Sequence, residues 1–174
     1  MNQVFDLLGS YLIGGIVLAA LVALILHFTS KSQETTLSQI TQYTVVETGM
    51  VMENDFDLIG YRVASGPKIM ALSADSICFR ADLNNTGTID TVKFYAGNTN
   101  GTLRLFKKIG TVTKWSMPVK SFSIQGIDSA GSQTYNIANI KSFIVSIVTH
   151  ENSIDDSQNN IGAFWKGRIY PKNL

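Results

Sequence analysis

Cysteine and histidine are scarce in this 174-residue sequence, which contains one cysteine, Cys78, and two histidines, His27 and His150. A single cysteine excludes an intrachain disulfide and a cysteine-based zinc site. Two isolated histidines do not support a histidine metal cluster or a Ser/His/Asp arrangement. No glycine-rich phosphate-binding loop is evident either. We therefore expect that the protein is not an enzyme and needs no cofactor.

The net charge is also small: the sequence has 14 Lys and Arg residues and 13 Asp and Glu residues, which gives +1. This balance excludes strong whole-chain attraction to nucleic acid. The sequence shows no obvious basic stripe interleaved with aromatic residues, and Lys107, Lys108 and Lys114 form only a small basic patch. We therefore expect no nucleic-acid partner.

The charge is divided unevenly along the chain. Residues 29–66 carry two basic and five acidic residues, a net of −3, whereas residues 67–174 carry twelve basic and seven acidic residues, a net of +5. A negative segment and a positive segment on one chain suit packing between copies. A split of this size is usually only a solvated surface, and we favour that interpretation over association.

The longest uncharged run covers residues 7–28 and consists mostly of apolar side chains. As a helix this run would span roughly 33 Å, against a bilayer hydrocarbon thickness of about 30 Å. Only Asp6 is charged before the run, whereas a cleaved secretory signal starts with basic residues and ends at a small-residue cleavage site. We therefore expect residues 1–28 to form a retained transmembrane helix.

Three positions in this segment are candidates for contacts between copies. Gly14 and Gly15 lie near its middle, where glycine permits close helix approach or local unwinding. Asp6 lies at the membrane edge, where a carboxylate is costly unless it is paired. One partner for Asp6 is the α-amino group of a neighbouring copy, at Met1. A helix cap or a carboxylate at headgroup level is an equally good interpretation.

Helical spacing of apolar residues continues beyond the run, and no proline occurs before Pro67. The pattern predicts one long helix through about Arg62, weakened at Gly49 and Gly60 and stopped by the Ser-Gly-Pro sequence that follows. Residues 29–66 would form its amphipathic second part.

Beyond this helix, short runs of β-forming residues alternate with turns. Seven short runs are candidates, residues 68–71, 76–82, 89–95, 103–107, 119–127, 142–150 and 163–170, and we expect six or so antiparallel strands from them. Packed on the long helix, these strands form a β-rich head, residues 67–174, and give an α+β fold.

Residues 82–90 resemble part of a calcium-binding loop, with Asp82, Asn84 and Asp90 as oxygen ligands. Lys93 occupies the position at which a bidentate glutamate is required, so the segment is not an EF-hand. A hairpin turn at residues 84–87 explains the same sequence without an ion, and we favour this interpretation over a calcium site.

An N-terminal membrane helix, an amphipathic continuation and a β-rich head together resemble type IV pilins and the pseudopilins of type II secretion. Residues 52–63 (MENDFDLIGYRV) look like the end of the long pilin helix, residues 77–90 like the first hairpin of the head, and residues 165–174 like its closing strand. One departure is Asp6, because pilins carry a glutamate at the fifth mature position. The chain is then either given in mature form or assembles without the usual leader processing.

The resemblance implies a helical filament whose core is formed by residues 7–28. In such a filament Asp6 would neutralise the amino terminus at Met1 of an adjacent copy, and the helix would unwind at Gly14 and Gly15. The resemblance also implies insertion in the cytoplasmic membrane before assembly, a pilus assembly machinery as partner and a location at the cell surface. Two alternatives stay open: a minor pseudopilin of a short secretion fibre, and a single-pass anchored periplasmic domain that binds a ligand.

Overall fold

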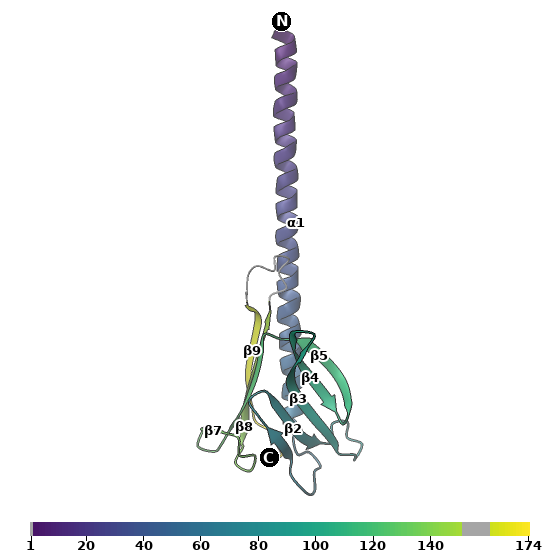
Figure 1. Ribbon diagram of the computed structural model, residues 1–174, viewed down its shortest axis with the longest axis vertical. Helices are drawn as coiled ribbons and strands as arrows, with labels where there is room; N and C mark the ends of the chain where they lie inside the picture. The colour runs from purple at the N-terminus through teal and green to yellow at the C-terminus, as the bar shows by residue number, and fades with distance from the viewer. Residues whose placement is uncertain (1, 151–160) are drawn as a thin grey trace.

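The computed structural model of the protein describes residues 2–150 and 161–174; Met1 lies outside these residues. The described chain forms one helix, α1 (Asn2–Asp57), followed by nine strands. Their bounds are β1 (Ile69–Leu72), β2 (Ser76–Ala81), β3 (Asp90–Thr99), β4 (Thr102–Ile109), β5 (Val112–Pro118), β6 (Ser121–Ile127), β7 (Gln133–Thr134), β8 (Ser142–His150) and β9 (Ile161–Ile169). Figure 1 shows α1 as a rod whose lower end is embedded in the head, with the N-terminus at the far end.

The long helix is confirmed, but it ends at Asp57 rather than at about Arg62. The next residues form a turn, in which Gly60 and Arg62 have φ angles of 79° and 58°, in the left-handed region that an α-helix cannot include. The backbone N–H of Gly60 donates to the carbonyl of Arg80 in β2 at 2.9 Å. The helix therefore stops where its backbone starts to pair with the head.

Gly49 does not weaken the helix, contrary to the expectation from its sequence. It lies inside the continuous α1, and a Cβ built on it would collide with the indole ring of Trp165 in β9. The absence of a side chain at Gly49 therefore lets the helix and β9 approach closely, which is a packing role that sequence spacing alone does not reveal.

The strands form two antiparallel sheets, so the α+β class is confirmed while the number of strands was underestimated. One sheet has the order β1-β2-β3-β4-β5 and the other the order β7-β6-β8-β9. The strand β5 was missed because its burial pattern lacks alternation: only Met117 in it is buried. The sheets are joined where the N–H of Ile124 donates to the carbonyl of Ala74 at 2.9 Å.

The core forms where the C-terminal part of α1 meets both sheets. The Phe56 ring of α1 makes edge-to-face contacts with Phe79 of β2, Phe94 of β3 and Phe143 of β8, at centroid distances of 5.6, 5.6 and 5.5 Å. All four side chains are fully buried. One aromatic residue of the helix thus fixes its position against the five-stranded and the four-stranded sheet at once.

A buried ion pair supplies a second connection between helix and sheet. Oδ2 of Asp55 in α1 lies 2.5 Å from Nζ of Lys107 in β4, and the two side chains are only 12% and 11% exposed. Burial raises the pKa of Asp55 above its usual value of 3.8, although Lys107 pulls it in the opposite direction. Lys107 therefore points into the head, unlike the solvated patch expected for it with Lys108 and Lys114.

Candidate functional site

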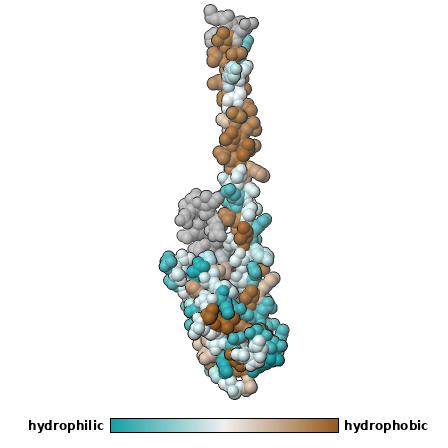
Figure 2. Space-filling view, turned by 90° about the vertical axis from the view of Figure 1, so that its right-hand side faces the viewer, coloured by the Kyte–Doolittle hydropathy of each residue, from teal (hydrophilic) through white to brown (hydrophobic). Residues whose placement is uncertain are grey.

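The N-terminal half of α1 is an apolar rod that the head does not cover. Fourteen large apolar side chains of residues 7–28 have exposed fractions between 49% and 74%. Figure 2 shows the helix in the upper part of the molecule with extensive brown surface, interrupted by a paler band. The helix is long and apolar enough to cross a membrane. An uncovered apolar rod of this length needs lipid or other protein around it, because apolar surface is unfavourable in water.

The glycines of this rod are not required by the packing of the chain itself. A Cβ built on Gly9, Gly14 or Gly15 would meet no atom within 4 Å. Glycine in a helix is less favourable than alanine by about 1 kcal/mol. The described chain gives no packing reason for these glycines, and the roles expected for Gly14 and Gly15, close helix approach or local unwinding, stay predictions.

Asp6 lies within α1, so the interpretation of its side chain as the cap of this helix is wrong. Its carboxylate is on the exposed surface, and its backbone carbonyl accepts a hydrogen bond from Oγ of Ser10 at 2.9 Å. Within residues 2–150 and 161–174, Asp6 is in no ion pair. Its proposed partner, the amino group at Met1, lies outside the described residues.

Apolar exposure continues beyond the membrane-length run, on the side of α1 opposite the head. We call this second surface the outer stripe; it was not recognised in the sequence. Its residues are spaced by three or four positions and are 41% to 71% exposed, whereas Val45 and Met52 on the other side of the helix are fully buried. The outer stripe consists of Ile40, Tyr43, Val46 and Met50.

The calcium candidate has its key carboxylate occupied by the protein. Oδ1 of Asp82 accepts from the N–H of Thr86 at 3.0 Å, and Oδ2 accepts from the N–H of Gly87 at 2.8 Å. Arg62 adds an ion pair to Oδ2 at 3.2 Å. Burial alone would raise the pKa of Asp82, but these hydrogen bonds and the Arg62 charge outweigh it and lower the pKa below 3.8.

The other two members of the calcium candidate do not complete a site. Oδ1 of Asn84 accepts from the hydroxyl of Thr86 at 2.7 Å, and Asp90 opens β3 opposite Ala81. The described residues contain no group of three or more His, Cys, Asp or Glu side chains placed to hold a metal ion. The geometry thus supports the hairpin turn, in which Asp82 acts as an acceptor for backbone N–H groups.

The outer face of the five-stranded sheet gathers basic and aromatic residues that the sequence analysis did not connect. Lys93 and Tyr95 of β3 pair across the strands with Lys108 and Phe106 of β4. Directly opposed residues in antiparallel strands lie on one face; alternation in residues 93–95 and 104–108 indicates which residues of each strand share a face, but not that the two strands are neighbours. Neighbouring residues of a strand point to opposite faces, so Lys107 points to the core and Lys108 lies on the outer face.

Comparison of the chain with protein-family models, with curated proteins and with solved structures finds no match.

Proposed function

We propose that the protein is a pilin-like structural subunit that polymerises through the N-terminal half of α1 into an extracellular filament. The observation that carries this proposal is the apolar rod of residues 7–28, which projects from a folded head and is not buried by any residue that the structure describes. A bilayer covers such a rod before assembly, and the rods of sister copies cover it in the filament. The pilus assembly machinery would transfer the helix from the first environment to the second.

The outer stripe favours packing between copies over lipid burial alone. Ile40 lies about 18 Å and Met50 about 33 Å beyond Phe28 along the helix axis. A bilayer hydrocarbon core of about 30 Å is already filled by residues 7–28, so it does not reach this second apolar surface. Other helices of a filament would cover both the rod and the outer stripe, since they run along the same axis.

Asp6 has a defined role in this proposal. In a filament core of apolar helices, the α-amino group of each copy needs a counter-charge, because an unpaired buried charge costs several kcal/mol. Asp6 of the neighbouring copy supplies that charge at the same end of the helix. This pairing also fixes how far one helix is shifted along the next.

Two other functions use the same helix and differ in what it joins. A minor pseudopilin would form only a short periplasmic fibre or its tip. A single-pass anchored domain would keep the helix in lipid permanently and bind a ligand with its head. A minor pseudopilin would be much less abundant in fibres than a major subunit. A single-pass anchored domain would form no fibres at all.

The test is negative-stain electron microscopy of material sheared from cells that express the chain, with antibody labelling of the head. We expect labelled fibres from the original chain and none from Asp6→Ala, with the Asp6→Ala protein still folded and membrane-bound. Asp75→Ala, which removes an exposed head carboxylate, is the matched control and should leave fibres intact. Normal fibres from Asp6→Ala would refute the role of Asp6, and the absence of labelled fibres from the original chain would refute the filament function.

A further inference from the structure

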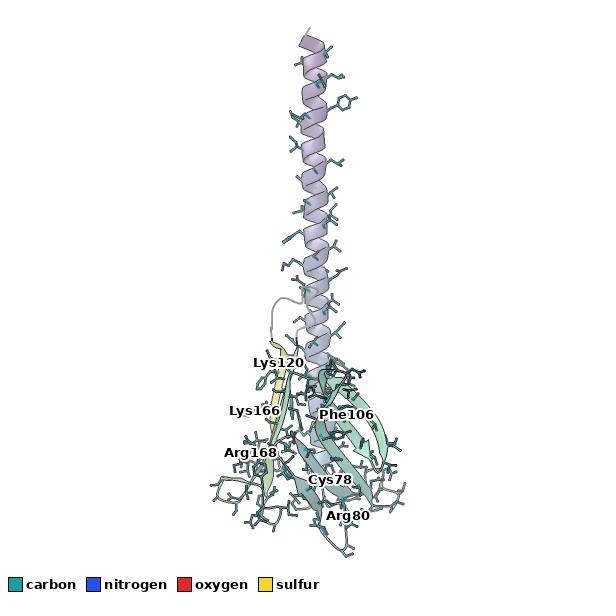
Figure 3. All side chains as sticks on the ribbon, in the orientation of Figure 1. Cys78, Arg80, Phe106, Lys120, Lys166 and Arg168 are labelled. Carbon is teal, nitrogen blue, oxygen red and sulfur yellow. The ribbon has the colours of Figure 1, made fainter. Side chains whose placement is uncertain are left out.

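The outer face of the five-stranded sheet carries four cationic side chains: Arg80, Lys93, Arg104 and Lys108. In the described residues none of the four belongs to an ion pair. The other residues at outward positions of β2 to β5 are uncharged: Ser76, Cys78, Thr91, Tyr95, Gly97, Phe106, Thr113 and Ser116. Figure 3 shows Cys78, Arg80 and Phe106 on this sheet, apart from Lys120, Lys166 and Arg168 on the side of the four-stranded sheet. We call this surface the basic face.

An aromatic pair stands at the centre of the basic face. The rings of Tyr95 and Phe106 stack with a centroid distance of 5.0 Å and an interplanar angle of 14°. The ammonium groups of Lys93 and Lys108 lie 5.0 and 5.3 Å from the Tyr95 centroid. A Cβ on the neighbouring Gly97 would contact both rings, so the absence of a side chain at this position leaves that side of the rings uncovered. Two half-buried rings thus hold two cations in fixed positions.

The charges of Lys93 and Lys108 repel each other, which opposes folding of the sheet and favours the binding of an anion. Lys93 and Lys108 are directly opposite each other on β3 and β4. Like charges in this arrangement destabilise a sheet, and no acidic side chain of the face offsets them. An anion placed between the two ammonium groups would replace this repulsion by two attractions.

We propose that the basic face binds single-stranded nucleic acid. Phosphates would pair with the four cations, and a base would stack on the Tyr95–Phe106 pair, which is how sequence-independent sites combine a cationic track with aromatic platforms. Arg104 and Lys108 are four residues apart on β4, or about 13 Å, so a strand that follows β4 places more than one phosphate between them. A net charge of +1 does not oppose this binding, because the acids that balance the four cations lie elsewhere on the chain.

The test is fluorescence anisotropy with the full chain in non-ionic detergent micelles and a labelled oligo(dT) of about 20 nucleotides. Four phosphate contacts predict a slope of log K against log salt near −2.8, since each contact on a single strand contributes about −0.7. Lys93→Gln/Lys108→Gln should halve this slope to about −1.4 and weaken binding at least about tenfold. The matched control Lys141→Gln/Lys166→Gln removes the same charge from exposed positions outside the basic face and should change neither value.

A second variant tests the aromatic contribution. Phe106→Leu should weaken oligo(dT) binding about tenfold and leave duplex binding unchanged, because only unpaired bases can stack on the ring. Phe106→Tyr keeps a ring and should keep the affinity, which separates stacking from a general change in the sheet. Equal losses of oligo(dT) affinity in Lys93→Gln/Lys108→Gln and in Lys141→Gln/Lys166→Gln would overturn the proposal. A duplex or an acidic polysaccharide such as heparin bound as tightly as oligo(dT) would also overturn it. Since detergent micelles separate the copies, none of these outcomes bears on the filament proposal.

Discussion

The two halves of α1 belong to one continuous helix but have different surroundings. Residues 7–28 are apolar and exposed on all sides, whereas the half that enters the head buries one apolar side at Val45, Met52 and Phe56 and leaves the outer stripe exposed on the other. A helix that packs on its own chain needs one apolar side, and a helix that is apolar all round needs an external partner. The periodicity of apolar residues, more than their number, indicates which half the chain buries by itself.

The largest expected effect compares two phenylalanines of this helix. Phe56→Ala removes a fully buried ring that contacts both sheets, and should destabilise the head by about 3 to 5 kcal/mol. Phe28→Ala, at a position 74% exposed, should leave the head unchanged. The measurement is urea unfolding in micelles, followed by the fluorescence of Trp115 and Trp165. Similar losses from both substitutions would contradict the division of the helix into two halves.

A second comparison concerns two adjacent lysines. Lys107→Met leaves Asp55 buried without its partner and should cost about 3 kcal/mol in the same unfolding measurement. Lys108→Met, on the outer face, should cost less than about 0.5 kcal/mol. The double variant Asp55→Leu/Lys107→Met should recover most of the loss, because an apolar pair of similar size avoids the cost of burying two charges. No recovery would show that the pair does more than neutralise charge.

Two glycines on the same helix give a third comparison. Gly49→Ala places a methyl group against the indole of Trp165, and overpacking of this kind costs about 1 to 3 kcal/mol. Gly14→Ala meets no atom of the chain and should raise helix stability by up to about 1 kcal/mol. Thermal unfolding followed by circular dichroism measures both. Filament assembly should instead be sensitive at Gly14: Gly14→Leu should block assembly while the monomer stays folded. Intact fibres from this variant would refute close helix approach at Gly14.

The smallest effect concerns pH and is confined to the head. The folded-state pKa of Asp82 lies below 3.8, so its contribution to stability is present above that pH and is lost as pH falls through the lowered pKa. The contribution of Asp55 to stability changes with pH in the opposite direction. Because its pKa is raised in the folded state, its ionisation opposes folding as pH rises. Asp82→Asn should therefore lower the urea midpoint at neutral pH, and the difference from the original chain should shrink below about pH 3.8. A difference independent of pH would show that charge is not the reason.

The sequence was sufficient for the class of fold and for the extent of the apolar rod. The uncharged run over residues 7–28 and the later change to β-forming runs are local signals, and both features are present in the structure. The helix end was missed because it depends on the bond from Gly60 to Arg80, a contact between segments that are not neighbours in the sequence. The strand β5 was missed because it lies at a sheet edge, where exposure removes the alternation that a sequence pattern needs.

The candidate site was predictable to a different extent in each part. Asp6, Gly14 and Gly15 could be named from their place in the apolar run, although the cap interpretation of Asp6 was wrong because α1 begins before it. The outer stripe could not be found, since the side of α1 that stays exposed is decided by strands far along the chain. The basic face needed the pairing of β3 with β4, which brings residues 93–95 beside residues 104–108.

The packing of α1 on β9 also dictates the order in which this protein can be made. The head-bound part of the helix, complete at Asp57, contacts β9 more than any other strand, and β9 begins only at Ile161. During synthesis the apolar rod can enter a membrane early, while Val45, Met52 and Phe56 stay without their full core until the last strand has been translated. Chains whose contacts join residues so distant in sequence fold slowly. If the rod enters a membrane at that stage, the nascent head is tethered while it is still unfolded, and it stays exposed to misfolding until β9 has been translated.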